Sequence, residues 1–304
     1  MIDLSVNIAG VRLKNPILTA SGCFSYGEEA GDIYDISRLG GIVTKSLTCL
    51  PREGHPPPKV VETDSGMLNA IGLSNVGIDK FISEKLPFLR RFDTACIVSI
   101  AGSRIEEYVT LTERLAEVDG VDAIEANISC PNVDEGGLEF GAYREPAGKV
   151  IAQIKRRAKH PVIAKLSPNV TDIVEIARSV VDSGADAISL INTLVGTVID
   201  IEKRSFKLSN RFGGLSGPAI KPVALAMVYK VANAVKVPVI GMGGIMKASD
   251  VVQFLLAGAS AVEVGTACFI DPLAPLRLVD GLQEYLAKHD EKSVKDIIGK
   301  VQRS

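Results

Sequence analysis

Histidine and tryptophan are scarce in this chain, and its cysteines form no close pair. Tryptophan is absent, and the three histidines, His55, His160 and His289, lie far apart in the sequence. That spacing excludes an HExxH zinc motif and supplies little for a nucleophile that a histidine activates. The five cysteines include no Cys-x-x-Cys motif. We therefore expect no metal site, no iron–sulfur cluster held by this chain and, because scattered thiols are typical of a reducing compartment, a cytoplasmic protein.

An excess of charge of one sign and a long apolar run are also lacking. The 34 Lys and Arg residues stand against 36 Asp and Glu residues, which gives a net charge of −2. Without a basic tract, we expect no nucleic-acid partner. Residues 1–6 have neither the basic nor the apolar region of a signal peptide, and no run approaches the roughly 18 apolar residues of a membrane helix. We therefore expect no membrane association.

The sequence does contain a regular alternation of short apolar runs and longer amphipathic stretches. The apolar runs predict eight β-strands, at residues 16–20, 41–44, 96–100, 123–127, 162–165, 187–191, 239–241 and 261–264. The other stretches predict helices near residues 28–38, 76–90, 104–118, 146–159, 172–183, 219–235, 249–257 and 273–288. Eight such units predict an α/β protein in which residues 1–304 form one closed (β/α)8 TIM barrel domain. An open doubly wound sheet is the alternative, but its glycine-rich turn follows the first strand, whereas here glycines cluster after the last two.

Three segments do not fit simple strand–helix units. Residues 1–14 predict an N-terminal β-hairpin across the bottom of the barrel. Residues 45–75 and 192–218 are too long for ordinary connections between a strand and a helix, and the second contains a possible hairpin that pairs 198–201 with 206–208. Because both long segments follow strands on the catalytic face, we expect them to form a small antiparallel cover over the C-terminal face of the barrel.

Polar residues follow several of the predicted strands. Lys45, Asn127, Lys165 and Asn192 come at strand ends, which is where barrel enzymes place their chemistry. Lysine is almost never fully buried unless it is paired, so two lysines at such positions favour a binding site over a packed core. Paired amides can recognise both donors and acceptors of a small polar ligand.

Glycines follow the last two predicted strands. Gly243 and Gly244 come after the seventh strand, and Gly265 with Thr266 comes after the eighth. Backbone N–H groups without a neighbouring Cβ can close around a phosphate there, although tight turns without a ligand would have the same composition. Together with the lysines and amides, the pattern favours a phosphate-bearing cofactor that carries the difficult chemistry, with a small polar anion beside it.

A thiol lies in the loop after the fourth predicted strand, in the stretch Asn127-Ile128-Ser129-Cys130-Pro131-Asn132. An ionised thiol can act as a base or a nucleophile, and the shortage of histidine removes its main competitors. The alternative is a free cysteine that packs as a small hydrophobic residue in a turn. We therefore regard Cys130 as the candidate catalytic residue.

Several motifs together resemble those of the class 1 dihydroorotate dehydrogenases, the flavin enzymes of pyrimidine synthesis. The resemblance runs from residue 13 to about residue 272, and its motifs are Leu13–Ile17, Ala20–Phe24, Leu68–Leu73, Asn127–Asn132, Ala164–Asn169, Ile191–Thr193, Gly213–Pro218 and Gly241–Ile245. The pattern is most similar to the class 1B catalytic subunit. Such a subunit binds FMN and passes electrons through a partner subunit, which holds FAD and a 2Fe–2S cluster, to NAD.

The resemblance implies a role for each matching residue. Cys130 would take the C5 proton of dihydroorotate while the C6 hydride goes to FMN. The residues implied to bind FMN are Ser21, Lys45, Ser46, Ser99, Asn127, Lys165, Ile191, Gly217, Gly243, Gly244, Gly265 and Thr266. Those implied to bind dihydroorotate or orotate are Lys45, Asn69, Ala70, Ile71, Gly72, Leu73, Asn127, Asn132, Asn192 and Thr193. Ser99 departs from the family pattern, since asparagine is expected there, and the assembly implied is a homodimer within a heterotetramer.

Other functions share parts of this pattern. A class 1A enzyme would use fumarate as the electron acceptor, and another FMN barrel would act on a different dihydropyrimidine. A barrel without redox chemistry, such as an aldolase, would use Lys165 as a Schiff-base lysine. A binding protein would have the same site without turnover. Bound flavin and its reduction by substrate separate these alternatives.

Overall fold

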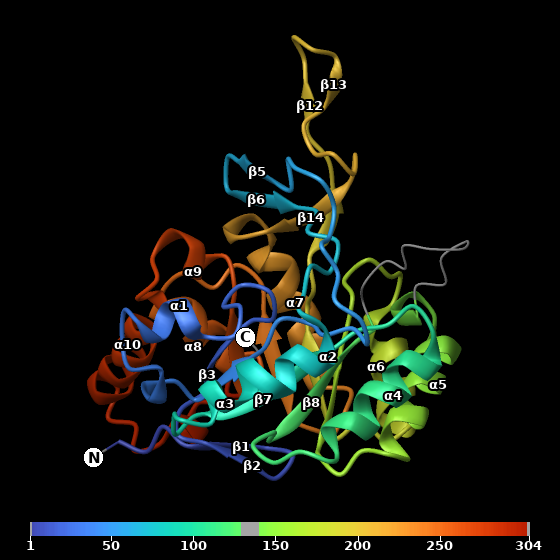
Figure 1. Ribbon diagram of the computed structural model, residues 1–304. Coiled ribbons are helices and arrows are strands. Elements are labelled where there is room, and N and C mark those ends of the chain that lie inside the picture. The colour runs from blue at the N-terminus through green and yellow to red at the C-terminus, as the bar shows by residue number, and fades with distance from the viewer. Residues whose placement is uncertain (1, 129–139, 303–304) are drawn as a thin grey trace.

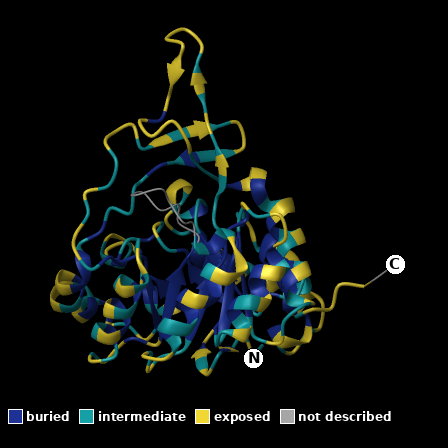
Figure 2. Cartoon of the chain, turned by 90° about the vertical axis from the view of Figure 1, so that its right-hand side faces the viewer, coloured by how far each residue is buried: buried dark blue, intermediate teal, exposed yellow. Residues whose placement is uncertain are grey.

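The computed structural model describes residues 2–128 and 140–302. Eight parallel strands close into a barrel in the order β10-β15-β16-β3-β4-β7-β8-β9. Their bounds are β3 (Ile17–Thr19), β4 (Gly41–Val43), β7 (Ala95–Ile100), β8 (Ala123–Asn127), β9 (Val162–Lys165), β10 (Ala187–Leu190), β15 (Val239–Met242) and β16 (Ala261–Val264). All eight predicted strands and the closed barrel are therefore confirmed. Every residue of these strands is buried, as their dark blue colour in Figure 2 shows, and helices cover the outside of the barrel.

Helices surround the barrel. They are α1 (Glu28–Gly31), α2 (Gly77–Lys80), α3 (Leu86–Leu89), α4 (Ile105–Leu115), α5 (Arg144–Lys155), α6 (Ile173–Asp182), α7 (Lys221–Ala232), α8 (Ala248–Leu256), α9 (Ala267–Ile270) and α10 (Ala274–Lys288). A π-helical segment (Phe81–Lys85) joins α2 to α3. The helix predicted at 28–38 is wrong in its second half, where Asp35 has extended backbone and caps a short 3₁₀ helix (Ile36–Arg38) by accepting from Ser37 N.

The start of α8 also differs from its prediction at residue 249. Lys247 is the N-cap, and Asp250 lies inside the first turn, where Oδ2 accepts from Met246 N at 2.9 Å and from Lys247 N at 3.1 Å. An acidic residue at this position satisfies N–H groups that have no partner within the helix. Asp172 caps α6 as its sequence suggests, since its carboxylate accepts from Val174 N.

The additions to the barrel lie at its two ends (Figure 1). At the bottom, β1 (Val6–Ile8) and β2 (Val11–Leu13) form the predicted hairpin. At the top, β5 (Val60–Thr63), β6 (Gly66–Asn69), β11 (Leu194–Gly196) and β14 (Gly213–Ser216) form a four-stranded antiparallel sheet. A second hairpin, β12 (Ile199–Asp200) with β13 (Ser205–Phe206), projects beyond that sheet. The cover predicted from two long loops is therefore confirmed as one sheet to which both loops contribute.

The cover contains glycines where neighbouring segments approach its strands closely. A methyl group on Gly214 would lie 1.9 Å from Thr193 Oγ1, and one on Gly66 would lie 2.1 Å from the carbonyl oxygen of Ser216. Only glycine allows so close an approach. The same glycines hide β6 and β14 from sequence reasoning, because glycine weakens the signal of a strand.

Candidate functional site

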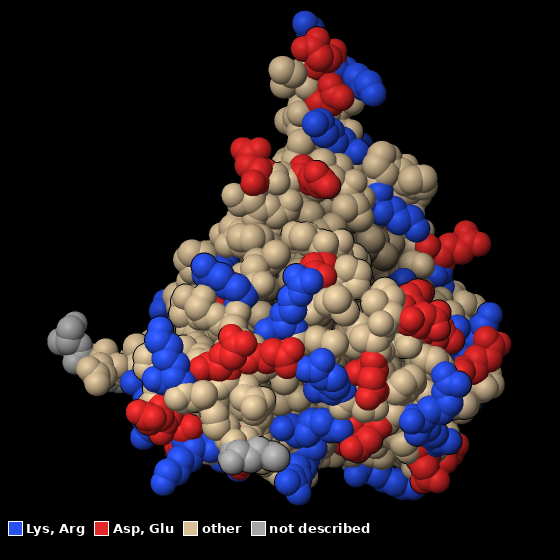
Figure 3. All heavy atoms as spheres, turned by 90° about the vertical axis from the view of Figure 1, so that its left-hand side faces the viewer, with Lys and Arg blue, Asp and Glu red and all other residues tan. Residues whose placement is uncertain are grey.

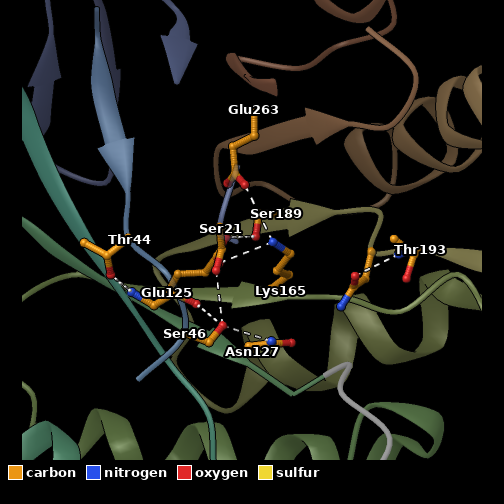
Figure 4. A network of polar contacts seen from close by, with 11 residues as sticks. Ser21, Thr44, Ser46, Glu125, Asn127, Lys165, Ser189, Thr193 and Glu263 are labelled. Carbon is orange, nitrogen blue, oxygen red and sulfur yellow. Dashed lines mark hydrogen bonds and ion pairs between the residues drawn. The ribbon is translucent and has the colours of Figure 1, made fainter. Parts of the chain in front are cut away.

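Hydroxyl groups from three strand ends form a chain beneath the cover. Ser46 Oγ lies 3.2 Å from Ser21 Oγ and 2.9 Å from Ser99 Oγ, and it accepts a hydrogen bond from Asn127 Nδ2 at 3.2 Å (Figure 4). Four of the predicted site residues thus lie in contact, although Ser99 and Asn127 belong to β7 and β8 and the two other serines follow β3 and β4. Ser99 is fully buried, and its N–H donates to Thr44 Oγ1. Its expected contact with flavin stays a prediction.

Lys165, at the end of β9, lies between two buried carboxyl groups. Its Nζ is 3.5 Å from Glu125 Oε1, on β8, and 3.7 Å from Glu263 Oε2, on β16. The Ser189 hydroxyl, on β10, donates to Glu125 Oε2 at 2.9 Å. Figure 4 shows these side chains converging inside the barrel, next to the hydroxyl chain. We refer to Glu125, Lys165, Ser189 and Glu263 as the lysine–carboxyl cluster.

The carboxyl groups fix the charge of Lys165. Burial lowers the pKa of its ammonium, but attraction by Glu125 and Glu263 outweighs burial and raises that pKa above its ordinary value of 10.5. Burial and repulsion by Glu125 raise the pKa of Glu263 well above its ordinary value of 4.5, against the attraction of Lys165. Lys165 is therefore a cation at neutral pH, held at the inner side of the site.

Sequence reasoning missed both carboxyl groups of the cluster and Ser189. The signal was nevertheless present, since Glu125 and Glu263 each lie between apolar neighbours in a predicted strand. A charged side chain in a strand that is buried on both faces needs a partner inside the barrel. Lys165 was the available cation, but its contact with β8 and β16 requires knowing which side chains point inward.

The segments that follow β15 and β16 meet the end of β14, a strand of the cover, through Gly244 and Thr266. A methyl group on Gly244 would lie 2.8 Å from the carbonyl oxygen of Gly217, and one on Gly217 would lie 3.5 Å from Thr266 Cγ2. Gly217, Gly243 and Gly244 have φ values of 95°, 121° and 74°, in the region that favours glycine. Thr266 Oγ1 also donates to Ser216 Oγ at 2.9 Å. The crowding leaves backbone rather than side chains at this surface, which fits the phosphate cradle expected there.

Ile191 and Gly265 complete the predicted cofactor residues. Ile191 is buried, and a methyl group on Gly243 would lie 3.5 Å from its Cγ1. A methyl group on Gly265 would lie 3.2 Å from Cys23 Sγ. Burial raises the pKa of the Cys23 thiol to about 11, so Cys23 remains protonated at neutral pH.

The predicted substrate residues that the structure describes come from the cover and from three strand ends. Asn69 Nδ2, on β6, donates to the carbonyl oxygen of Gly214 at 3.2 Å, and Thr193 N donates to Asn192 Oδ1 at 2.8 Å. Burial, and then repulsion by Lys59 of the cover, lower the pKa of the half-buried Lys45. The segment that continues from Asn69 includes Ala70, Ile71, Gly72 and Leu73, and the Ile71 carbonyl accepts from His55 N at 3.0 Å.

Two predicted residues, Cys130 and Asn132, lie outside the described residues. Asn127 and Ile128, which precede them, are both buried, and the carbonyl of Asn127 accepts from the Tyr108 hydroxyl at 2.9 Å. Cys130 follows Asn127 by three residues in the sequence.

Within residues 2–128 and 140–302, no three His, Cys, Asp or Glu side chains group as a metal site. No helix in the same ranges is long and apolar enough to span a membrane. On the face that Figure 3 shows, basic and acidic side chains lie interspersed. The expected absence of metal and nucleic acid stays a prediction.

Comparison with known proteins covers nearly the whole chain. The family model for dihydroorotate dehydrogenase matches residues 3–286. A dihydroorotate dehydrogenase B (NAD(+)) catalytic subunit from Geotalea uraniireducens is 54% identical over 297 residues, which cover 98% of this chain and 97% of that protein. A protein of the same name from Bacteroides thetaiotaomicron is 53% identical over 98% of this chain and 99% of its own length. Another, from Geobacter metallireducens, is 53% identical over 99% of this chain and 98% of its own length. The matched span, residues 3–286, includes the strands of the barrel, the cover and all positions of the predicted site.

Proposed function

Because the chain belongs to the dihydroorotate dehydrogenase family, we propose that it oxidises dihydroorotate to orotate in pyrimidine biosynthesis, as the catalytic subunit of an NAD-linked enzyme. The observation that supports this proposal most strongly is that three features lie at the same end of the barrel. They are the hydroxyl chain, the Lys165 cation and the phosphate cradle formed by glycines such as Gly217 and Gly244. Its relatives are named as dihydroorotate dehydrogenase B (NAD(+)) catalytic subunits, which favours NAD over fumarate as the final acceptor.

We propose FMN as the cofactor. Gly217, Gly244 and Thr266 lie together and suit a phosphate, while Lys165 and the hydroxyl chain suit the polar edge of a flavin ring. The other proposed contacts are Lys45, Ile191, Gly243 and Gly265. When bound, FMN supplies the hydride acceptor. The fixed charge of Lys165 would stabilise negative charge at the ring edge, because a preorganised cation in a buried site needs no reorganisation.

We propose that Cys130 removes the C5 proton of dihydroorotate. Lys45 would attract the substrate carboxylate, and Asn69, Asn127, Asn132 and Asn192 would orient the pyrimidine ring through their amides, with Thr193 and the segment 70–73 around it. A thiol with an ordinary pKa near 8.5 is only a few per cent ionised at neutral pH. The rate of substrate oxidation should therefore rise with pH until the thiol is fully ionised.

The raised pKa of Lys165 argues against an aldolase-like barrel. A Schiff-base lysine attacks a carbonyl as the neutral amine, and such lysines are activated by a lowered pKa. Here, attraction by the buried carboxyl group of Glu125, 3.5 Å from Nζ, holds the side chain as an ammonium. Lys165 is suited to stabilise an anion and is unsuited to act as a nucleophile.

We propose a cytoplasmic heterotetramer. A homodimer of this chain would form its core, and each copy would pass electrons to a subunit that carries FAD and a 2Fe–2S cluster. The printed names of the relatives include the words catalytic subunit, which favours a separate partner. The four described cysteines, Cys23, Cys49, Cys96 and Cys268, are free thiols, which is typical of a reducing compartment.

The test is product identification with purified chain and the electron-transfer subunit encoded in the same genome. Dihydroorotate and NAD should yield orotate and NADH in equal amounts, and omission of the partner should abolish NADH formation. Orotate formation by the chain alone with fumarate would replace this proposal with a class 1A enzyme. Oxidation of dihydrouracil without oxidation of dihydroorotate would overturn it.

A further inference from the structure

The lysine–carboxyl cluster contains more acid than its one cation can neutralise. The side chains of Glu125, Glu263 and Lys165 are exposed by only 0%, 1% and 6%, so water does not compensate their charges. Two carboxylates with one ammonium would leave a net negative charge inside the barrel, which is costly where the dielectric constant is low. A proton on one of the carboxyl groups makes the cluster neutral.

The two carboxyl groups are not equivalent. Glu125 accepts from the Ser189 hydroxyl and lies closer to Lys165 Nζ, at 3.5 Å. Glu263 lies at 3.7 Å from the same nitrogen, and within the described residues neither of its oxygens has a hydrogen-bond partner. Hydrogen bonds to a carboxylate favour its ionised form. The proton therefore belongs on Glu263, and repulsion by Glu125 acts in the same direction.

Another titratable group also faces the cluster. Cys23, in the loop after β3, interacts with both Lys165 and Glu263, and its burial keeps the thiol neutral. The groups that bear on Glu263 are thus Glu125 from β8, Lys165 from β9 and Cys23 from the β3 loop. None of them supplies a second positive charge.

We propose that Glu263 is a positioning residue that holds a proton inside the barrel and so keeps the lysine–carboxyl cluster neutral, with Lys165 opposed by Glu125 alone. This inference rests on the proposed function in one respect, because it assigns the cluster to the floor of the flavin site. An ionised Glu263 would place an additional negative charge next to the ring edge, where reduction adds negative charge. Its proton therefore favours the reduced cofactor.

The decisive comparison uses two single substitutions, Glu263→Gln and Glu125→Gln, which preserve side-chain shape. In the protein without flavin at neutral pH, infrared spectroscopy should detect the C=O stretch of one buried protonated carboxyl group in the wild type. The band should be absent from Glu263→Gln, because that substitution removes the protonated group. It should also be absent from Glu125→Gln, because Glu263 should release its proton once it becomes the only counter-charge of Lys165. Absence of the band from the wild type, or its persistence in Glu125→Gln, would overturn the proposal.

The flavin-loaded proteins provide a second readout. Each single variant keeps one carboxylate opposite Lys165, so its flavin midpoint potential should match that of the wild type. The double variant leaves one uncompensated positive charge and should favour the reduced flavin by about tenfold. If each single variant raises the potential by about half as much as the double variant does, both carboxyl groups are ionised in the wild type and the inference is wrong. If the chain binds no flavin, the proposed function fails, and the infrared result still decides where the proton lies.

Discussion

Replacement of Glu263 by glutamine should remove a loss of stability that the wild type undergoes as the pH rises. The difference in free energy of unfolding between the variant and the wild type should therefore grow with pH, in favour of the variant. Glu263 carries a raised pKa in the folded state and an ordinary one, near 4.5, in the unfolded state. Above about pH 5 the folded wild type therefore binds one proton more than the unfolded chain. Its unfolding releases that proton, and stability falls as pH rises toward the pKa of the folded state. Glutamine cannot ionise, so the variant lacks this loss.

The magnitude follows from the release of one proton. The ratio of the two unfolding equilibrium constants should change by about tenfold for each pH unit, which amounts to about 3 kcal/mol between about pH 5 and about pH 7. This is a large part of the free energy of unfolding of an ordinary domain, roughly 5–15 kcal/mol. The free energy of unfolding of the variant increases by less if the amide packs less well against Lys165. Such a loss of packing energy would not vary with pH, so the dependence on pH still reports the proton.

Urea denaturation followed by circular dichroism, repeated across this pH range, measures both free energies of unfolding. Glu62→Gln provides a matched control, because it makes the same substitution at an exposed position on a strand of the cover. Parallel pH dependences of the wild type and Glu263→Gln would refute the reasoning, since they would mean that Glu263 is ionised in the folded protein.

Three further predictions concern the rest of the site. Gly244→Ala should weaken flavin binding at least tenfold in a fluorescence titration, because its methyl group would lie 2.7 Å from Lys221 Cβ. Gly299→Ala is the control and should bind flavin normally, because Gly299 also has a positive φ but its methyl group would have nothing within 4 Å. Asp250→Asn should lower the free energy of unfolding by about 2 kcal/mol in urea, since it loses an ion pair with Lys221 and weakens the start of α8. Cys130→Ser should shift the pH dependence of dihydroorotate oxidation to higher pH, and an unchanged profile would argue against direct proton removal by residue 130.

Parallel strands were predictable here because both of their faces are buried. Segments such as Gly41–Val43 and Val239–Met242 contain no polar side chain, and turn glycines such as Gly184 separate helix from strand. Strands of the cover were less predictable. Gly66–Asn69 and Gly213–Ser216 contain glycines that the close approach of neighbouring backbone and side chains requires, and those glycines obscure strand propensity.

The residues of the site also divide into those that the sequence could predict and those that it could not. Lys45, Asn127 and Lys165 could be selected because polar residues at strand ends are unusual in a packed barrel. Glu125 and Glu263 could not be paired with Lys165 from sequence, because a strand pattern does not say which residues of β8, β9 and β16 point into the interior at one level. The role of Ser99 also needed the structure, which places its hydroxyl against Ser46.

Anaerobic stopped-flow mixing of the flavin-loaded chain with dihydroorotate tests the central claim most directly, because it isolates substrate oxidation from the partner and from NAD. Dihydroorotate should bleach the flavin absorbance of the wild type in a single turnover. Cys130→Ala should keep its flavin but bleach at least about a hundredfold more slowly, as expected when a general base is removed. Unchanged absorbance in the wild type, or equally fast bleaching in Cys130→Ala, would contradict the account.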